Sequence, residues 1–420
     1  MHFLFIFLQL ALSTFSRNPE LSAGNLCGYF PQDTLVSEAP AGYQAFYISH
    51  IARHGSRYLD KRGMTCFQAI DTLTRYADNL TDDGRALMED LKMFRDLSIG
   101  NEGALTPLGA REHRQICARM TRHYPEVFSD GRRSGVVAYS TTSPRAIASM
   151  KAFLGELNGR VPGLSVQSYE TNFGKDARSR EVTGREYLIK GKRKEKVNSK
   201  REELLAVGNK ILEGRRGYEV FASRIFQDPS RVPVATVENL AWTSFRALKL
   251  GRVTEPATMP GMGKYFTPEE LYRLWVPSCI VWLRYVHLPG YDSPLAREVG
   301  GGIKERLVKD ADQAIRRGST TAATLRFSHD TSLLPLMSAL SLEGAVFECP
   351  ETELMEYFQN YNVICPACNV QLVFYRSDSG PVLVKILLNE KETLIHGLAP
   401  DTGCFYDWNR VKRFWAKGRS

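Results

Sequence analysis

The chain has 420 residues, of which 43% are hydrophobic, 10% aromatic and 24% charged. This is the composition of an ordinary globular protein and excludes a disordered, collagen-like or multi-span membrane protein. At roughly 150 residues per domain, the length favours two or three domains. Lys and Arg number 55 and Asp and Glu 46, a formal charge of +9, which permits nucleic acid, an anionic membrane surface or phosphorylated small molecules as partners.

The N-terminus carries an apolar run from Phe3 to Leu12 followed by small residues. This run is too short to cross a bilayer, which takes about 20 residues. It favours a signal peptide over residues 1–16 and export to a periplasm, the extracellular space or a secretory lumen. The run is preceded by His2 and by no Lys or Arg, so a frayed hydrophobic N-terminus is the alternative. We find no other candidate for an integral membrane segment.

The eight cysteines are too few to build a disulfide scaffold, although an even number permits pairs. Cys365 and Cys368 form the only CxxC motif, and no second pair stands at zinc-binding spacing. A local structural role is therefore favoured over metal binding.

From about residue 43 to 150 the sequence alternates between short β-prone runs and helical patterns, as in an α/β domain. Gln44–Ser49 and Val136–Tyr139 are predicted strands. Thr106 is suited to the N-cap and Pro107 to the first position of a helix between them.

From about 151 to 300 the sequence predicts mostly helical and irregular structure. Thr267-Pro-Glu-Glu270 is a capping-box pattern, and Pro277 is expected to kink or end the helix that follows.

After residue 300 the α/β character returns. Apolar residues recur at helical spacing from Ile303 to Ile315, and Gly318 is placed to stop that helix. Thr324–Phe327 is a predicted strand, with a further helix from about Thr331. Asn369–Tyr375 and Val382–Leu388 predict a hairpin. We therefore expect one α/β domain, residues 25–150 and 301–420, interrupted by a mainly helical insertion over 151–300.

The first chemical motif is Arg53-His54-Gly55-Ser56-Arg57, at the end of the first predicted strand. Ligands of open α/β sheets bind at such strand ends, and guanidinium groups suit phosphate oxygens. Neighbouring cations lower the pKa of a histidine and keep its imidazole neutral and nucleophilic. Taken alone, the tripeptide Arg-His-Gly is more often a basic surface loop.

Two further motifs also follow predicted strands. His329-Asp330-Thr331 stands between a strand and a helix; Asp330 is a plausible general acid, and Thr331 is expected to cap the helix. Arg145 follows Pro144 in the first turn of another helix, where a cation opposes the helix dipole. A phosphate partner would offset that cost; the alternative is a surface arginine.

Together, Arg53–Arg57 and the distant His329-Asp330 resemble the histidine acid phosphatases, the second branch of the histidine phosphatase superfamily. The resemblance extends from about Tyr43 to Glu392 and is weaker in the insertion. It implies a Rossmann-like mixed sheet flanked by helices, with the helical insertion as a cap over the active site.

The resemblance also implies a two-step mechanism. His54 attacks phosphorus to form a phosphohistidine, which water then hydrolyses. Asp330 matches the proton donor of the family, and the residues that match its phosphate pocket are Arg53, Arg57, Arg145 and His329. No metal ion and no organic cofactor is implied.

The substrate is less defined. Leu325–His329, Leu333–Leu336 and Val384–Glu390 are similar to the multiple inositol polyphosphate phosphatases. That group carries His-Ala-Glu where this chain has His329-Asp330-Thr331, the form of many phytases and general acid phosphatases. We expect a hydrolase of inositol polyphosphates such as phytate; the alternative is an acid phosphatase for sugar phosphates or many phosphomonoesters.

Other functions are less favoured. A phosphoryl-transferring mutase fits poorly with Asp330 beside His329 and with the long insertion, and a non-catalytic anion-binding protein fits poorly with the intact motifs. No nucleic-acid-binding motif with interleaved aromatic residues is present. His50 is expected to be a buried strand residue rather than a member of the pocket, and Tyr58 has either a packing or a substrate-binding role.

The positive charge is uneven. Residues 174–203 contain 11 Lys or Arg and 6 Asp or Glu, or +5 of the total +9. If this basic segment faces the pocket, it would attract a polyanion; the alternative is a solvated helix face.

Overall fold

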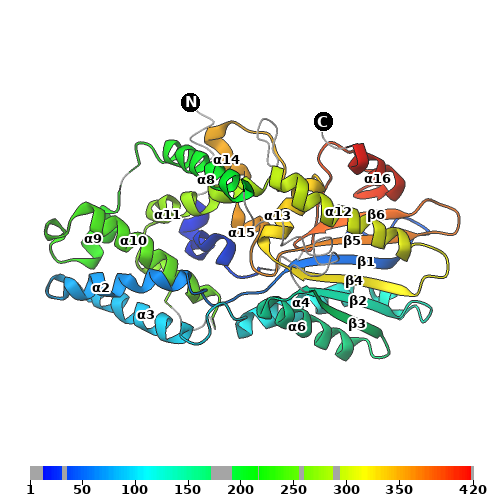
Figure 1. The fold of residues 1–420 in the computed structure, drawn as a ribbon, viewed down its shortest axis with the longest axis horizontal. Coiled ribbons are helices and arrows are strands. Elements are labelled where there is room, and N and C mark those ends of the chain that lie inside the picture. Colours follow the sequence, from blue (N-terminus) through cyan, green and yellow to red (C-terminus); the bar gives the residue numbers. More distant parts are fainter. Residues whose placement is uncertain are drawn as a thin grey trace.

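A computed structural model describes residues 13–30, 36–171, 192–215, 217–254, 260–286 and 294–417. At its centre lies an eight-stranded mixed sheet in the order β3-β2-β4-β1-β5-β6-β7, with β8 beside β6 (Figure 1). The strands are β1 (Gln44–Arg53), β2 (Gly135–Thr141), β3 (Ser165–Thr171), β4 (Thr321–Ser328), β5 (Asn369–Arg376), β6 (Leu383–Leu388), β7 (Lys391–Glu392) and β8 (Phe405–Asp407). The predicted α/β class with a mixed sheet is confirmed.

Helices cover both faces of this sheet. In Figure 1, α4 and α6 lie below it and α12 and α16 lie above it. The helices are α2 (Gln68–Arg75), α3 (Asp82–Ser98), α4 (Pro107–His123), α5 (Pro125–Ser129), α6 (Pro144–Arg160), α8 (Lys192–Ile211), α9 (Glu219–Ile225), α10 (Val234–Leu248), α11 (Pro268–Ile280), α12 (Pro294–Ala314), α13 (Asp330–Ala339), α14 (Leu354–Tyr357), α15 (Asn360–Val363) and α16 (Trp408–Lys417).

Several local predictions are confirmed because caps and turns depend on neighbouring residues. The Thr106 side chain accepts a hydrogen bond from the Gly109 amide at the start of α4, and Thr267 forms its capping box with Glu270. The predicted hairpin is the antiparallel pair β5 and β6.

The ends of two helices differ from the prediction. Pro277 lies inside α11, which continues to Ile280 and passes into a 3-10 helix, η9 (Val281–Tyr285). Burial of Cys279 and Ile280 holds this last turn in place. Helix α12 begins at Pro294 and ends at Ala314, so Gly318, with a φ of +83°, lies in the turn beyond it.

Two features differ from the predicted domain boundaries. Helix α6 runs through position 150, and β3 pairs in parallel with β2, so the sheet continues into the predicted insertion. Helices α2 and α3 pack with α9 and α10 at the helical end of the molecule, although they precede residue 150 (Figure 1). An amphipathic pattern predicts a helix but not the surface on which that helix packs. The division into domains stays a prediction.

The N-terminal segment contributes to the core. Residues 1–12 lie outside the described residues. Phe15, which falls within the predicted signal peptide, is 1% exposed and packs edge-on against Trp275 with ring centroids 5.5 Å apart. No helix among the described residues is both long and apolar enough to cross a membrane. The signal peptide and export stay predictions.

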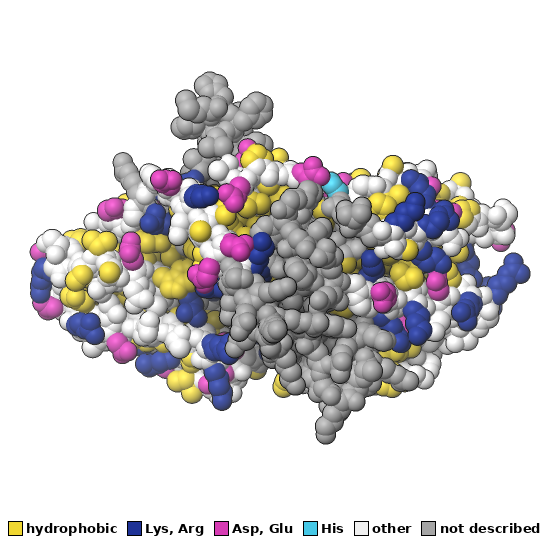
Figure 2. All heavy atoms as spheres, turned by 45° about the horizontal axis from the view of Figure 1, so that its top comes forward, with side chains coloured by type: hydrophobic (Ala, Val, Ile, Leu, Met, Phe, Trp, Pro, Cys, Tyr) yellow, Lys and Arg dark blue, Asp and Glu magenta, His cyan; other side chains and the backbone are white. Residues whose placement is uncertain are grey.

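The basic segment 174–203 lies largely outside the described residues, which resume at Lys192 with α8. On the face seen in Figure 2, Lys and Arg side chains are interspersed with Asp and Glu at the left-hand end and gather toward the right-hand end. The orientation of the basic segment toward the pocket stays a prediction.

Two buried histidines lie between the sheet and helices α4 and α6. His50 is fully buried, with its ring centroid 5.3 Å from that of Phe153 and 5.7 Å from that of Phe327. His113 of α4 is fully buried as well. His50 is thus a core residue. Burial lowers the pKa of each to about 3, and in His50 the neighbouring His113 and Arg326 act in the same direction.

We expect these histidines to make the fold sensitive to acid. Because their pKa is lower in the folded chain than in the unfolded chain, the unfolded chain binds more protons between pH 6.5 and pH 3. The contribution of each histidine to the free energy of unfolding is therefore greatest above pH 6.5. It decreases below that pH, by about 2 kcal/mol per histidine at pH 5. Urea unfolding between pH 7 and pH 5 measures this loss. Because the buried His54 also has a pKa well below its usual value and adds a similar contribution, His113→Leu should reduce this pH dependence by about a third; an unchanged pH dependence would contradict the assignment.

Candidate active site

The predicted site residues follow three parallel strands that end at one edge of the sheet. Strand β1 ends at Arg53, which lies opposite Ser328 at the end of β4, and the His54 amide donates a hydrogen bond to the Ser328 carbonyl at 3.0 Å. The rings of His54 and His329 are 5.4 Å apart in an edge-to-face arrangement. His329 Nε2 lies 3.1 Å from Oγ1 of Thr141, the last residue of β2. The structure thus brings two of the three motifs into direct contact.

The imidazole of His54 is buried and held in one orientation. Its Nδ1 lies 2.8 Å from the Gly55 carbonyl oxygen. Since a carbonyl oxygen can only accept, Nδ1 carries the proton and Nε2 carries the lone pair. Burial holds the pKa of His54 well below its usual value, and the charges of Arg53, Arg145, His329 and Arg57 lower it further. His54 is therefore a neutral imidazole at pH 7 with Nε2 available as a nucleophile.

The guanidinium of Arg53 is 1% exposed and joins three segments of the chain. Its Nη1 donates to the carbonyl oxygens of Asn25 at 2.6 Å and Ile364 at 2.7 Å. Its Nη2 lies 3.0 Å from Oδ2 of Asp330. A buried charge is costly unless it is paired and hydrogen-bonded. These partners meet that requirement at Nη1 and Nη2, whereas Nε is buried with no hydrogen-bond partner among the described residues.

Two further arginines, Arg57 and Arg145, add positive charge near His54. Arg57 donates from Nη1 to the Tyr58 carbonyl at 2.8 Å, and its Nη2 lies 3.6 Å from Asp60. Arg145 stands in the first turn of α6, as predicted, after Ser143, whose side chain makes no capping hydrogen bond. The positive charges of both arginines contribute to the lowered pKa of His54, as that of Arg53 does.

Asp330 is the first residue of α13, and this start differs from the prediction. His329 occupies the N-cap position in an extended conformation, and the Asp330 side chain accepts the Thr331 amide at 2.8 Å. Thr331 therefore lies inside the first turn and does not cap the helix. The other carboxylate oxygen of Asp330 contacts Arg53 at 3.0 Å and Asn25 Nδ2 at 3.4 Å.

The sequence analysis did not identify two polar residues that contact these motifs. Asn25, in the 3-10 helix η1 (Pro19–Leu26), contacts both Arg53 and Asp330. Glu112 of α4 accepts a hydrogen bond from the Ser56 amide at 2.7 Å. Asn25 lies in no recognisable motif. Glu112 had one signal: it is an acidic residue five positions after Pro107, the predicted first position of a helix, and it lies on the same helix face as the apolar Leu108 and Ile116.

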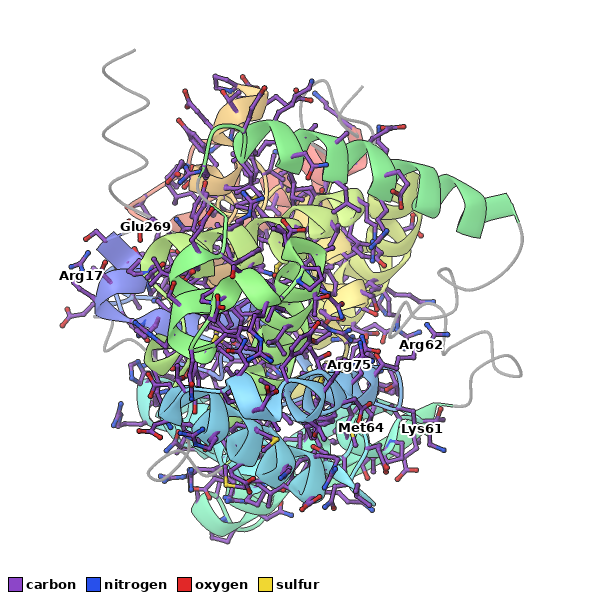
Figure 3. All side chains as sticks on the ribbon, turned by 90° about the vertical axis from the view of Figure 1, so that its left-hand side faces the viewer. Arg17, Lys61, Arg62, Met64, Arg75 and Glu269 are labelled. Atoms are coloured by element: carbon purple, nitrogen blue, oxygen red, sulfur yellow. The ribbon has the colours of Figure 1, made fainter. Side chains whose placement is uncertain are left out.

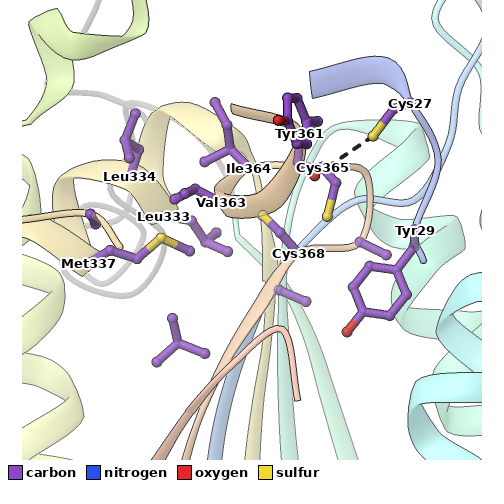
Figure 4. Packing of buried hydrophobic residues seen from close by; sticks show 14 of the residues in the cluster. Cys27, Tyr29, Leu333, Leu334, Met337, Tyr361, Val363, Ile364, Cys365 and Cys368 are labelled. Carbon is purple, nitrogen blue, oxygen red and sulfur yellow. Dashed lines mark hydrogen bonds between the residues drawn. The ribbon is translucent and has the colours of Figure 1, made fainter. Parts of the chain in front are cut away.

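The CxxC motif forms a turn that supports the loop after β1. The Ile364 and Cys368 carbonyls accept from Arg53, and the Ala367 amide donates to the His54 carbonyl at 3.0 Å. Cys365 and Cys368 are buried free thiols that lie near Cys27, whose thiol donates to the Tyr361 carbonyl (Figure 4). Among the described residues no three His, Cys, Asp or Glu side chains are grouped so as to hold a metal ion.

Comparison with known proteins yields a family match over part of the chain and a shared fold. Residues 259–389, which include His329 and Asp330, match the histidine phosphatase superfamily, branch 2. None of the curated proteins matches the chain. The multiple inositol polyphosphate phosphatase of Bifidobacterium longum in complex with phosphate superposes with a TM-score of 0.72 at 17% identity, covering 94% of this chain and 97% of that one. Its complex with inositol hexasulfate gives 0.70 at 17% identity and the same coverage.

The phytase of D. castellii gives a TM-score of 0.70 at 14% identity, covering 95% of this chain and 84% of that one. At these identities the structural likeness shows a shared fold. With the family match, it confirms the resemblance to the histidine phosphatase superfamily, branch 2, that the sequence motifs indicate. The roles of the individual site residues stay predictions.

The geometry of the loop Arg53–Arg57, which follows β1, depends on the close packing of two glycines. A Cβ built on Gly109 of α4 would lie 2.2 Å from the Ser56 carbonyl oxygen, and one on Gly55 would lie 2.3 Å from the Gly109 carbonyl oxygen. Contacts this short force the loop and α4 apart.

We therefore expect Gly109→Ala to destabilise the fold by about 1–3 kcal/mol. Gly155 of α6 is the matched control, because a Cβ there meets no atom within 4 Å, and Gly155→Ala should stabilise by about 0.5–1 kcal/mol. Thermal unfolding measures both. Equal midpoints for the two variants would show that the close approach carries no energetic cost.

Proposed function

We propose that the protein is a phosphomonoesterase that works through a phosphohistidine at His54. The observation that carries this proposal is the neutral imidazole of His54, with its Nε2 lone pair free, among Arg53, Arg57 and Arg145. Such a cluster binds a phosphoryl group and stabilises the charge that develops during its transfer.

The proposed reaction has two steps. First, Nε2 of His54 forms a bond to phosphorus as the ester P–O bond breaks, and protonated Asp330 gives its proton to the leaving alkoxide. Second, the oxygen of a water attacks phosphorus, the P–N bond breaks, and the water gives a proton to the Asp330 carboxylate. The phosphoryl oxygens compete with Asp330 for Arg53, so substrate binding opens the Arg53–Asp330 ion pair. The released carboxylate takes the proton of the monoanionic phosphate ester, which it then gives to the leaving alkoxide. After the second step, the proton on Asp330 passes to inorganic phosphate, which leaves as the monoanion, and the Arg53–Asp330 ion pair forms again.

We further propose inositol polyphosphates, phytate included, as the substrate class. The fold is shared with a phosphatase crystallised with inositol hexasulfate and with a phytase. Exposed cations also follow the phosphate loop: Lys61 and Arg62 lie four and five residues after Arg57 and point outward on the same side of the molecule as Arg75 (Figure 3). The His329-Asp330-Thr331 sequence supports the second candidate, a general acid phosphatase.

Incubation of the purified protein with phytate, followed by ion-exchange separation of the products, tests this function. We expect release of inorganic phosphate and a limited set of lower inositol phosphates. His54→Ala should abolish turnover, because it removes the proposed nucleophile, while phosphate binding partly survives. Hydrolysis at the normal rate by His54→Ala would overturn the mechanism, and phosphate release from sugar phosphates alone would favour the second candidate.

The proposed acid role of Asp330 predicts a dependence on the leaving group. Asp330→Asn cannot donate a proton, so inositol phosphates and other alkyl esters should lose about 100-fold or more in kcat. Aryl phosphates, whose leaving groups need no proton, should lose much less. Steady-state kinetics on both substrates makes the comparison. Equal losses would show that Asp330 positions the substrate instead.

A further inference from the structure

A buried carboxylate, that of Glu112, contacts the loop Arg53–Arg57 at Ser56. Glu112 of α4 is 2% exposed. Its Oε2 accepts the Ser56 amide at 2.7 Å, and its Oε1 accepts the Ser56 hydroxyl at 2.7 Å and the Tyr29 amide at 2.9 Å. Three donors directed at one carboxyl group suit its ionised form.

The Ser56 amide belongs to the same peptide unit as the carbonyl that holds His54. On one side of this peptide, the Gly55 carbonyl oxygen accepts from His54 Nδ1 at 2.8 Å. On its other side, the Ser56 amide donates to Glu112. The three groups therefore form one chain, from the carboxylate through the peptide to the imidazole. A hydrogen bond at one end of a peptide polarises the other end and strengthens the bond made there.

We propose that Glu112 is a positioning residue that acts on His54 through the Gly55–Ser56 peptide. Its negative charge makes the Gly55 oxygen a stronger acceptor, which fixes the proton on Nδ1 and leaves Nε2 as the nucleophile. The same chain stabilises the positive charge that the imidazole gains when Nε2 bonds to phosphorus. A carboxylate that contacts a histidine directly orients its tautomer in a similar way; here a peptide unit stands between them. This inference rests on the proposed function of His54.

Glu112 also connects the loop to the N-terminal segment. The Tyr29 amide that it accepts lies four residues after Asn25, which contacts Arg53 and Asp330. Glu112 thus connects the loop Arg53–Arg57 with the N-terminal segment that carries Asn25 and Tyr29. Burial raises the pKa of Glu112 above its usual value, and the hydrogen bonds from Ser56 and Tyr29 and the charge of Arg53 counter that rise only in part.

The chain offers a closely matched control. Glu270 of α11 is 3% exposed and also accepts two backbone amides and one hydroxyl, from Phe221, Thr267 and the Thr267 side chain. It caps a helix outside the site. Glu112→Gln and Glu270→Gln therefore remove a charge from equivalent surroundings and should lose similar stability.

We expect Glu112→Gln to lower kcat on an aryl phosphate by about 30-fold with KM changed by less than about threefold, and Glu270→Gln to leave both unchanged. Nitrogen-15 NMR of His54 should show the Nδ1–H tautomer in the wild-type protein and a mixture of tautomers in Glu112→Gln. Three results would overturn the proposal. They are a kcat of Glu112→Gln within about threefold of wild type, an equal loss of kcat in Glu270→Gln, and an Nε2–H tautomer of His54 in the wild-type protein. The tautomer is read without substrate, so this result stands apart from any failure of the wild-type protein to release phosphate.

Discussion

The burial of the Arg53 guanidinium is the constraint on which the rest of the site depends. A charge at 1% exposure is costly unless it is paired, and the partners of the two Nη atoms of Arg53 come from Asn25, Asp330 and Ile364. These residues are up to 339 positions apart in the sequence. The loop after β1 therefore takes its form only when η1, the start of α13 and the turn before β5 have closed around it. In this protein the proposed site is a product of the whole fold rather than of one local motif.

The same cations determine the state of His54. A histidine on the surface would be partly protonated near pH 6.5, whereas burial together with Arg53, Arg145 and Arg57 holds the pKa of His54 well below that. Burial is the main cause of the lowered pKa, and the positive charges act in the same direction. These charges help to keep the proposed nucleophile unprotonated and would also attract a phosphoryl group, so one arrangement of charges serves both requirements. The carboxylates of Asp330 and Glu112 limit the repulsion among the cations from two opposite sides.

The positions of the proposed site residues could be predicted because each lies next to a strand end, where residue type and position are both visible in the sequence; their roles stay predictions. Thr106 and the Thr267–Glu270 box were predictable because caps are local. Asn25 and Glu112 were not, since their roles come from contacts that span 28 to 305 positions of the sequence. The packing of α2 and α3 at the helical end, and the continuation of α11 past Pro277, depend likewise on distant surfaces. The prediction that Thr331 caps α13 is wrong because the helix begins one residue earlier, at Asp330, whose side chain accepts the Thr331 amide.

The mixed direction of the sheet explains how the partners of Arg53 reach it. Strand β1 pairs in parallel with β4 and antiparallel with β5. The parallel pairing brings the ends of both strands together and so places His329 beside His54. The antiparallel pairing brings the start of β5 to the same edge, with Asn369 opposite Ala52, and thereby places the preceding turn with Ile364 and Cys368 against Arg53. A parallel β5 would bring its far end, Arg376, to this edge and add a cation where carbonyl acceptors are needed. The reversal of strand direction at β1 is therefore what lets a buried arginine stand beside the proposed nucleophile.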